Sequence, residues 1–144
     1  SAASQQQALM ELEHMIGQRA GPERARCNQE LKRLQSQQQW RDSRQLMGLM
    51  GRANMPADVG RYNALILWYK KNKQWAEALA VLLEMKAAGA KPSIVSFNSV
   101  IDACGKARQL KVAFELFEQV GHEGLTPDTV TYTSLLDACG KAQQ

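Results

Sequence analysis

Residues 102–107, Asp-Ala-Cys-Gly-Lys-Ala, recur unchanged as residues 137–142, and the two copies lie 35 residues apart. A fixed period between about 20 and 50 residues is typical of repeat proteins, in which a small unit is stacked because it cannot bury its apolar face alone. The hexapeptide could be a motif around a reactive cysteine rather than part of a repeat. Because Cys104 and Cys139 are equivalent positions of successive units, we expect both to be small packing residues with reduced thiols.

The period extends over the rest of the chain. Equivalent positions hold similar residues, as at Tyr62, Phe97 and Tyr132. We therefore expect complete repeats at residues 59–93 and 94–128 and a degenerate repeat at residues 24–58. The second helix of a partial repeat is expected at residues 1–23, and the first helix of an incomplete repeat at residues 129–144.

Within each unit, apolar residues recur every three or four positions, which is typical of amphipathic helices. Breaks near Asn72-Lys73 and near residues 107–109 divide the units into two helices, and Gly89 and Gly124, each followed three residues later by proline, end the second helix. No alternating stretch is long enough for a strand. The sequence predicts an all-α fold, a right-handed α-solenoid of stacked helix-turn-helix repeats with about seven or eight helices.

Composition limits the classes of protein that fit. The chain is 44% hydrophobic, but no apolar run approaches 18 residues, so we expect no membrane span. The net charge of +4 suits a polyanionic partner without establishing one. The first residue is Ser rather than Met, so we expect either a removed targeting segment or a piece of a longer array.

The repeat resembles the pentatricopeptide repeat. The resemblance is carried by Val-Thr-Tyr-Thr-Ser-Leu-Leu-Asp-Ala-Cys-Gly-Lys-Ala at residues 130–142, by Ala-Phe-Glu-Leu-Phe-Glu-Gln-Val at residues 113–120, and by Gly-Leu-Thr-Pro-Asp at residues 124–128. The related tetratricopeptide repeat has a period of about 34 residues and a different aromatic pattern. The resemblance implies a P-type array that binds single-stranded RNA, one base per repeat, along the face built by the first helices.

The resemblance also implies which residues select the base. Pentatricopeptide repeats use the fifth and the last residue of a unit, where an amide offers a donor and an acceptor and a carboxylate or hydroxyl can orient it. The implied base-selecting residues are Asn28 with Asp58, Asn63 with Ser93, Asn98 with Asp128, and Thr133. The two Asn–Asp pairs imply uracil and the Asn–Ser pair implies a pyrimidine, cytosine ahead of uracil. The expected target is a short pyrimidine run rich in uridine.

The second residue of a unit supplies an apolar wedge between neighbouring bases in this family. Val95 and Val130 fit that role and are the expected base-clamping residues. Ala25 and Gly60 occupy the same position in the two preceding units, and neither has a side chain large enough to pack on a base. The resemblance is therefore weakest in the base-clamping position of these two units.

Three lysines occupy equivalent positions in successive units: Lys71, Lys106 and Lys141. Stacking would align them into a column of positive charge, and we expect them to contact successive phosphates. The alternative is a solvated helix end, where the helix dipole favours lysine without any ligand.

A different function for the same fold is that of a structural scaffold, because fold does not determine function. Such a chain would be a subunit of a large organellar complex, for example a ribosome, and would contact other protein subunits or RNA without base selectivity. An exposed apolar face around Leu135 and Leu136 would favour such a partner.

No catalytic site is expected. Asp102 and Asp137 are related by the period rather than paired, and the two histidines are isolated, so the sequence indicates no catalytic residues, cofactor or metal. The resemblance implies a role in organellar RNA processing, stability or translation. It implies a mitochondrion or a chloroplast without choosing between them.

Overall fold

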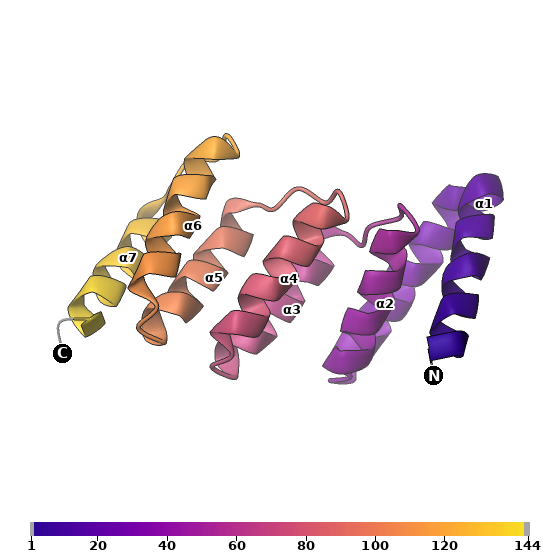
Figure 1. Cartoon of the computed structure of the whole chain (residues 1–144), viewed down its shortest axis with the longest axis horizontal. Helices are drawn as coiled ribbons and strands as arrows, with labels where there is room; N and C mark the ends of the chain where they lie inside the picture. Colours follow the sequence, from indigo (N-terminus) through magenta and orange to yellow (C-terminus); the bar gives the residue numbers. More distant parts are fainter. Residues whose placement is uncertain (1, 143–144) are drawn as a thin grey trace. The chain divides into compact units, whose positions relative to one another are not determined.

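The chain is helical throughout the part that the structure describes. This computed structural model describes residues 2–142, with the side chains of residues 9, 12–22 and 141–142 left out. Its helices are α1 (Ala2–Ser36), α2 (Trp40–Arg52), α3 (Val59–Lys71), α4 (Trp75–Ala87), α5 (Ile94–Lys106), α6 (Leu110–His122) and α7 (Thr129–Ala142) (Figure 1). No strand occurs between residues 2 and 142. The predicted all-α helical-repeat class is confirmed.

The 35-residue period reappears in the backbone of the turns. Residues with positive φ follow the first helix of successive repeats at Gln38, Lys73 and Arg108. Others follow the second helix of successive repeats at Asn54, Gly89 and Gly124. A left-handed residue cannot continue a right-handed helix, so these positions end the helices. The breaks expected near Asn72-Lys73 and near residues 107–109 are confirmed.

Helix α1 continues across residues 23 and 24, where the sequence places the boundary between the partial repeat and the degenerate one. It therefore covers both the helix expected at residues 1–23 and the first helix of the next unit. The boundaries of the individual repeats stay a prediction.

The chain divides into two compact units. The first comprises residues 1–65 and 84–91, and in it α1 packs against α2. Its buried apolar side chains are Leu31, Leu34, Met47, Met50, Met55, Tyr62, Leu65 and Met85. The buried Gln35 joins α1 to α3, because its Nε2 donates to the carbonyl of Arg61 at 3.1 Å and its Oε1 accepts from Arg61 Nη1 at 3.2 Å.

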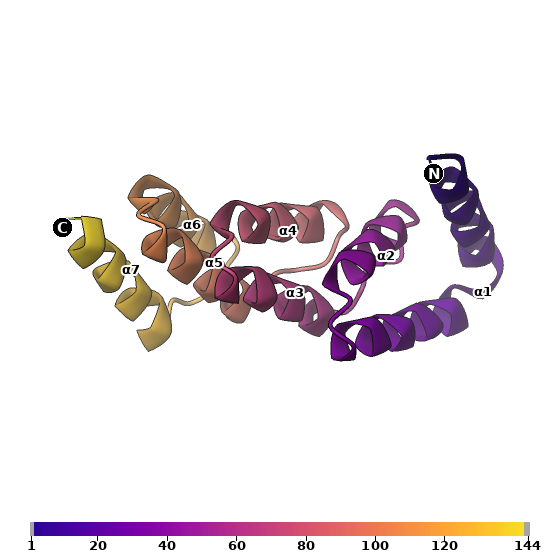
Figure 2. The ribbon, with the colours of Figure 1, turned by 90° about the horizontal axis from the view of Figure 1, so that it is seen from below.

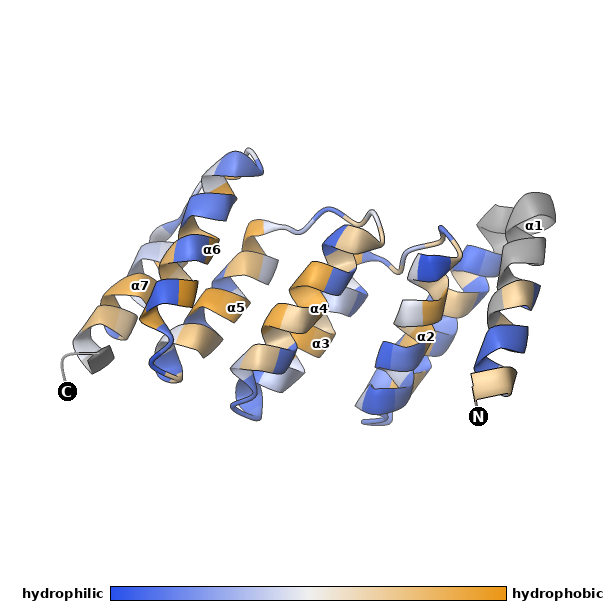
Figure 3. Ribbon diagram, viewed as in Figure 1, coloured by the Kyte–Doolittle hydropathy of each residue, from blue (hydrophilic) through white to orange (hydrophobic). Residues whose placement is uncertain are grey.

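The second unit comprises residues 66–83 and 92–144, and in it α5 packs against both α6 and α7 (Figure 2). Apolar residues make up much of α5 (Figure 3), and Phe97, Val100, Ile101 and Cys104 are fully buried. Leu135 of α7 is buried as well, whereas its neighbour Leu136 is 71% exposed. The apolar face expected around these two leucines is therefore exposed at Leu136 and covered at Leu135.

The repeated hexapeptide is a packing motif at its first copy. A Cβ atom added to Gly105 would lie 2.8 Å from the Cβ of Ala138, so only glycine permits this approach of α5 to α7. Cys104 has no exposed surface, and burial raises the pKa of its thiol to about 12. Its predicted role as a packing residue is confirmed, and a thiol of this kind is unreactive at neutral pH. Cys139 is half-buried.

The described helices include none with the length and apolar character that crossing a bilayer requires.

Candidate nucleic-acid interface

A groove of about 480 Å³ lies between α5 and α7 in the second unit, and we call it the α5–α7 groove. Val95 and Val130 line it and are 55% and 56% exposed, so both are accessible to a ligand in the groove. Asn98, Asp128 and Thr133 line the same groove. The structure thus brings together, in one place, two expected base-clamping residues and three expected base-selecting residues.

Asn98 is held in one orientation by two neighbours. Its Nδ2 donates to Oδ1 of Asp128 at 3.0 Å, and its Oδ1 accepts from the hydroxyl of Thr131 at 2.5 Å. Turning the amide over would set its oxygen against the Asp128 carboxylate, leaving two acceptors face to face. The amide retains one N–H and one lone pair for a ligand. Its two hydrogen bonds to the protein determine which side presents the donor and which the acceptor.

Thr131 also joins Asp128 to the start of α7. The Thr131 backbone N–H donates to Asp128 Oδ1 at 3.0 Å, and the Asp128 backbone N–H donates to Thr131 Oγ1 at 3.1 Å. This reciprocal arrangement is a capping box, which satisfies backbone N–H groups that the helix leaves unpaired. Thr131 is fully buried, so the sequence expectation missed a residue that positions both members of the base-selecting pair. The available signal was the Asp-x-x-Thr spacing at residues 128–131.

The Asp128 carboxylate is charged over the whole neutral and mildly acidic range. The hydrogen bond from the Thr131 backbone N–H, followed by the one from Asn98, holds the pKa of Asp128 below its usual value of 3.8. A lowered pKa in the folded state means that the carboxylate stabilises the fold above the unfolded-state pKa and loses that effect as the pH falls through the folded-state pKa.

We therefore expect the stability difference between the wild type and Asp128→Asn to be constant from pH 7 to pH 5. Below pH 3.8 the difference should shrink as the native carboxylate takes up a proton. Thermal unfolding of both proteins at several pH values measures this. A difference that has already vanished at pH 5 would contradict the lowered pKa.

One lysine of the expected column, Lys106, takes part in an ion-pair cluster with Asp102 and Lys70. Asp102 Oδ2 lies 3.1 Å from Lys70 Nζ and 3.0 Å from Lys106 Nζ. Burial raises the pKa of Asp102, but the hydrogen bonds and charges of the two lysines outweigh that effect and lower it overall. Lys106 is thus partly neutralised within the protein, Lys71 is exposed in the last turn of α3, and the Lys141 side chain lies outside the described residues.

A second groove, of about 550 Å³, lies between α1 and α3 in the first unit, and we call it the α1–α3 groove. Asn28 and Asp58 line it and are in contact, but through different atoms than Asn98 and Asp128 in the α5–α7 groove. Asn28 Oδ1 accepts from the backbone N–H of Asp58 at 3.0 Å, and Asn28 Nδ2 donates to the carbonyl of Arg24 at 3.0 Å. The Asp58 carboxylate lies 3.8 Å from Arg24 Nη2 instead.

The difference between the two pairs follows from one residue. Arg61 occupies the position that Thr131 holds after the other pair, and it has no hydroxyl to accept from the backbone N–H of Asp58. The amide oxygen of Asn28 accepts this hydrogen bond instead. The carboxylate therefore does not orient the amide in the α1–α3 groove.

The remaining sequence-predicted positions lie on α1, on α3 and at the start of α5. Ser93 caps α5 in a capping box with Ser96, and Asn63 is half-buried on α3. Ala25 is exposed in the α1–α3 groove, and a Cβ atom on Gly60 would meet nothing within 4 Å. No cluster of three or more His, Cys, Asp or Glu side chains in the described part of the chain could hold a metal ion.

Comparison with known families identifies repeats in the same region. A model described as "Pentatricopeptide repeat domain" matches residues 45–107, and one described as "PPR repeat family" matches residues 92–141. The two matches together span residues 45–141, which include α3 to α6 and the α5–α7 groove. No curated protein matches the chain.

Proposed function

Because the chain belongs to the pentatricopeptide repeat family, whose members typically bind RNA, we propose that it binds single-stranded RNA and selects uracil in the α5–α7 groove. One observation supports this more than any other. The Asn98 amide, held by Asp128 and Thr131, lines a groove together with two exposed valines.

The groove offers a base both stacking and hydrogen bonding. Val95 and Val130 provide apolar contacts for the two faces of a base. A flat aromatic base that packs between them removes their apolar surface from water. The Asn98 amide offers its remaining N–H and lone pair to the Watson–Crick edge. Uracil presents an N–H beside a carbonyl oxygen, which complements that pair.

The proposal extends to the other repeats with the boundaries given by the 35-residue period. Asn63 with Ser93 would favour a pyrimidine, so that the target is a short pyrimidine run. Asn28 with Asp58 is not included, because the Asp58 carboxylate does not orient the Asn28 amide. Lys71, Lys106 and Lys141 would lie along the phosphates. The protein acts without catalysis of its own in organellar RNA processing, stability or translation, in a mitochondrion or a chloroplast.

A titration tests the proposal. Single-stranded oligo(U) and oligo(A) of equal length are titrated at two salt concentrations with the wild type, with Asn98→Ala and with Asn72→Ala. Asn72 is an exposed asparagine in the turn after α3, where its Nδ2 donates to the Trp68 carbonyl at 2.8 Å, and it serves as the matched control. We expect the wild type and Asn72→Ala to prefer oligo(U), and Asn98→Ala to lose about tenfold of that preference, as for one good base contact.

Two outcomes would contradict the proposal. Equal binding of both strands, dependent on salt alone, would exclude base selection at Asn98. Absence of binding at low salt would exclude RNA as the ligand and favour the scaffold function, in which the chain contacts other protein subunits.

A further inference from the structure

The α1–α3 groove carries an excess of positive charge. The side chains of Arg24, Lys32 and Arg61 line it, and Asp58 is its one carboxylate among the described residues. Arg61 is bound to Gln35 and Arg24 lies 3.8 Å from Asp58, whereas no ion pair is found for Lys32 within the described part of the chain. The groove therefore presents cationic groups that its own residues do not neutralise.

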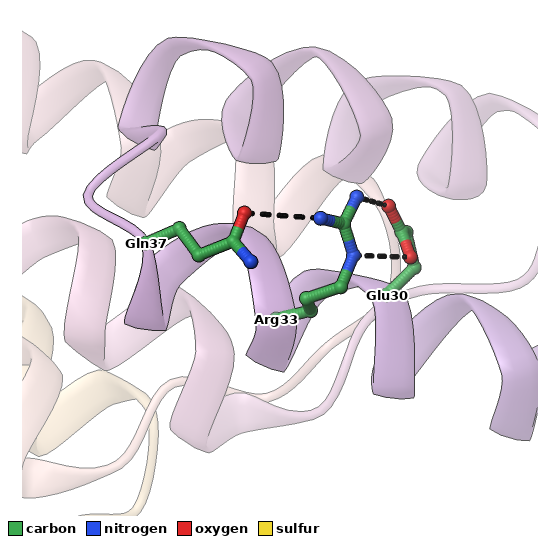
Figure 4. A network of polar contacts seen from close by, with 3 residues as sticks. All are labelled: Glu30, Arg33 and Gln37. Atoms are coloured by element: carbon green, nitrogen blue, oxygen red, sulfur yellow. Dashed lines mark hydrogen bonds and ion pairs between the residues drawn. The ribbon is translucent and has the colours of Figure 1, made fainter.

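Other cations on the same helix are neutralised locally. Arg33 Nε donates to Glu30 Oε2 at 3.0 Å, a second guanidinium N–H of Arg33 donates to Glu30 Oε1, and Arg33 Nη1 donates to Gln37 Oε1 at 3.0 Å (Figure 4). Arg26 Nη1 lies 3.3 Å from Glu23 Oε1. In both pairs a glutamate three residues earlier faces the arginine, an arrangement that stabilises helices. Neither Arg24 nor Lys32 has such a partner on α1, and these two cations line the groove.

The α5–α7 groove has the opposite charge at the same position of the repeat. Lys32 corresponds to Asp102 and Asp137, and these two carboxylates line the α5–α7 groove together with Asp128 and Lys70. The base-clamping position differs as well, since Ala25 stands where Val95 and Val130 do. One groove is thus apolar and acidic, and the other is basic and has no large apolar side chain at the base-clamping position.

We propose that the α1–α3 groove binds the phosphodiester backbone of single-stranded RNA, through Arg24, Lys32 and Arg61, without selecting the base. This proposal rests on the proposed function, because it assigns a second contact to the same ligand. The chain then combines a groove that selects a base with a groove that anchors the strand by charge. The α5–α7 groove is lined by three carboxylates and one lysine, so cations outside it, Arg24 and Lys32 among them, would hold the phosphates.

The two kinds of contact have different signatures in binding. Each phosphate neutralised by a cation releases counterions, and for single strands the slope of log affinity against log salt changes by about 0.7 per contact. A contact to a base changes the ratio between two sequences and leaves that slope almost unchanged. Salt dependence and base preference therefore separate the two grooves.

The test compares two double variants of equal charge. Arg24→Ala/Lys32→Ala removes two groove cations, while Arg61 is kept because it binds the buried Gln35. Arg41→Ala/Arg52→Ala removes two exposed arginines from α2 in the same compact unit and is the control. Each protein is titrated with oligo(U) and oligo(A) from low to physiological salt, and helical content is checked by circular dichroism.

We expect the groove variant to bind both strands about tenfold more weakly at low salt, with the salt slope reduced by about 1.4 for its two lost contacts. The ratio between oligo(U) and oligo(A) should not change. Equal effects of the groove variant and the control would overturn the proposal, and so would a loss confined to oligo(U), which would mean base selection by Asn28. Absence of RNA binding by the wild type would instead refute the proposed function itself, and this proposal with it.

Discussion

The Gly105→Val substitution is expected to destabilise the second compact unit by about 3 kcal/mol, because overpacking a tight helix contact costs this order of free energy. The added Cβ would lie 2.8 Å from the Cβ of Ala138 and 3.4 Å from its Cα. Ala138 is attached directly to the α7 backbone and cannot turn aside, so α7 must move away from α5. The midpoint of thermal unfolding should fall by about 10 °C.

Two further variants show whether the close approach is the cause. Gly140 is the same residue of the second hexapeptide, and a Cβ atom there would meet nothing within 4 Å. Gly140→Ala should therefore change stability by less than about 1 kcal/mol, and in the favourable direction, since alanine has the higher helix propensity. Gly105→Ala adds the same Cβ and should also destabilise the unit, and Ala138→Gly should restore most of the stability lost in Gly105→Ala. Failure of that rescue would show that the two residues do not limit the packing of α5 against α7.

The Thr131→Val substitution is expected to have the largest effect on base selection outside the pair itself. Valine keeps the shape of threonine, but the Asn98 oxygen loses its donor and the Asp128 backbone N–H loses its acceptor. Unmade buried hydrogen bonds of this kind cost about 1–3 kcal/mol each. The Asn98 amide is then held by Asp128 alone, so we expect the preference for oligo(U) to fall at least fivefold, with lower thermal stability.

Thr131→Ser separates the hydroxyl from the packing of the methyl group. Serine keeps the hydroxyl, and Ser96 already forms the equivalent capping box at the start of α5. The preference for oligo(U) should therefore survive in this variant, at a modest loss of stability. If serine and valine reduce the preference equally, the hydroxyl does not position Asn98.

The fold was predictable because its determinants are local and repeat. The helical spacing of apolar residues and the glycines at 89 and 124 are visible in sequence, and the 35-residue period allows each unit to support the interpretation of the next. The period also identified Cys104 as a packing residue. It could not identify Gly105 as the closest contact, because that depends on the distance between α5 and α7.

The sequence could not predict the hydrogen-bond partners of the proposed base-selecting residues. Asn28 and Asn98 occupy equivalent positions in the sequence, yet only Asn98 is oriented by the carboxylate of its paired aspartate. The difference comes from the residues that follow each pair, Arg61 and Thr131, whose contacts cross between helices. The ion pair of Lys106 with Asp102 could have been predicted, because the two residues are four apart on α5, whereas the contact of Lys70 with Asp102 joins two helices.

The side-chain amide of Asn98 provides the most direct test of base selection. With protein labelled by ¹⁵N, the Asn98 NH₂ signals can be assigned from their loss in Asn98→Ala and followed as RNA is added. We predict that they shift on addition of oligo(U) and much less with oligo(A), while the Asn72 amide is unaffected by either. Unchanged Asn98 signals under conditions where oligo(U) is bound would contradict base selection in the α5–α7 groove.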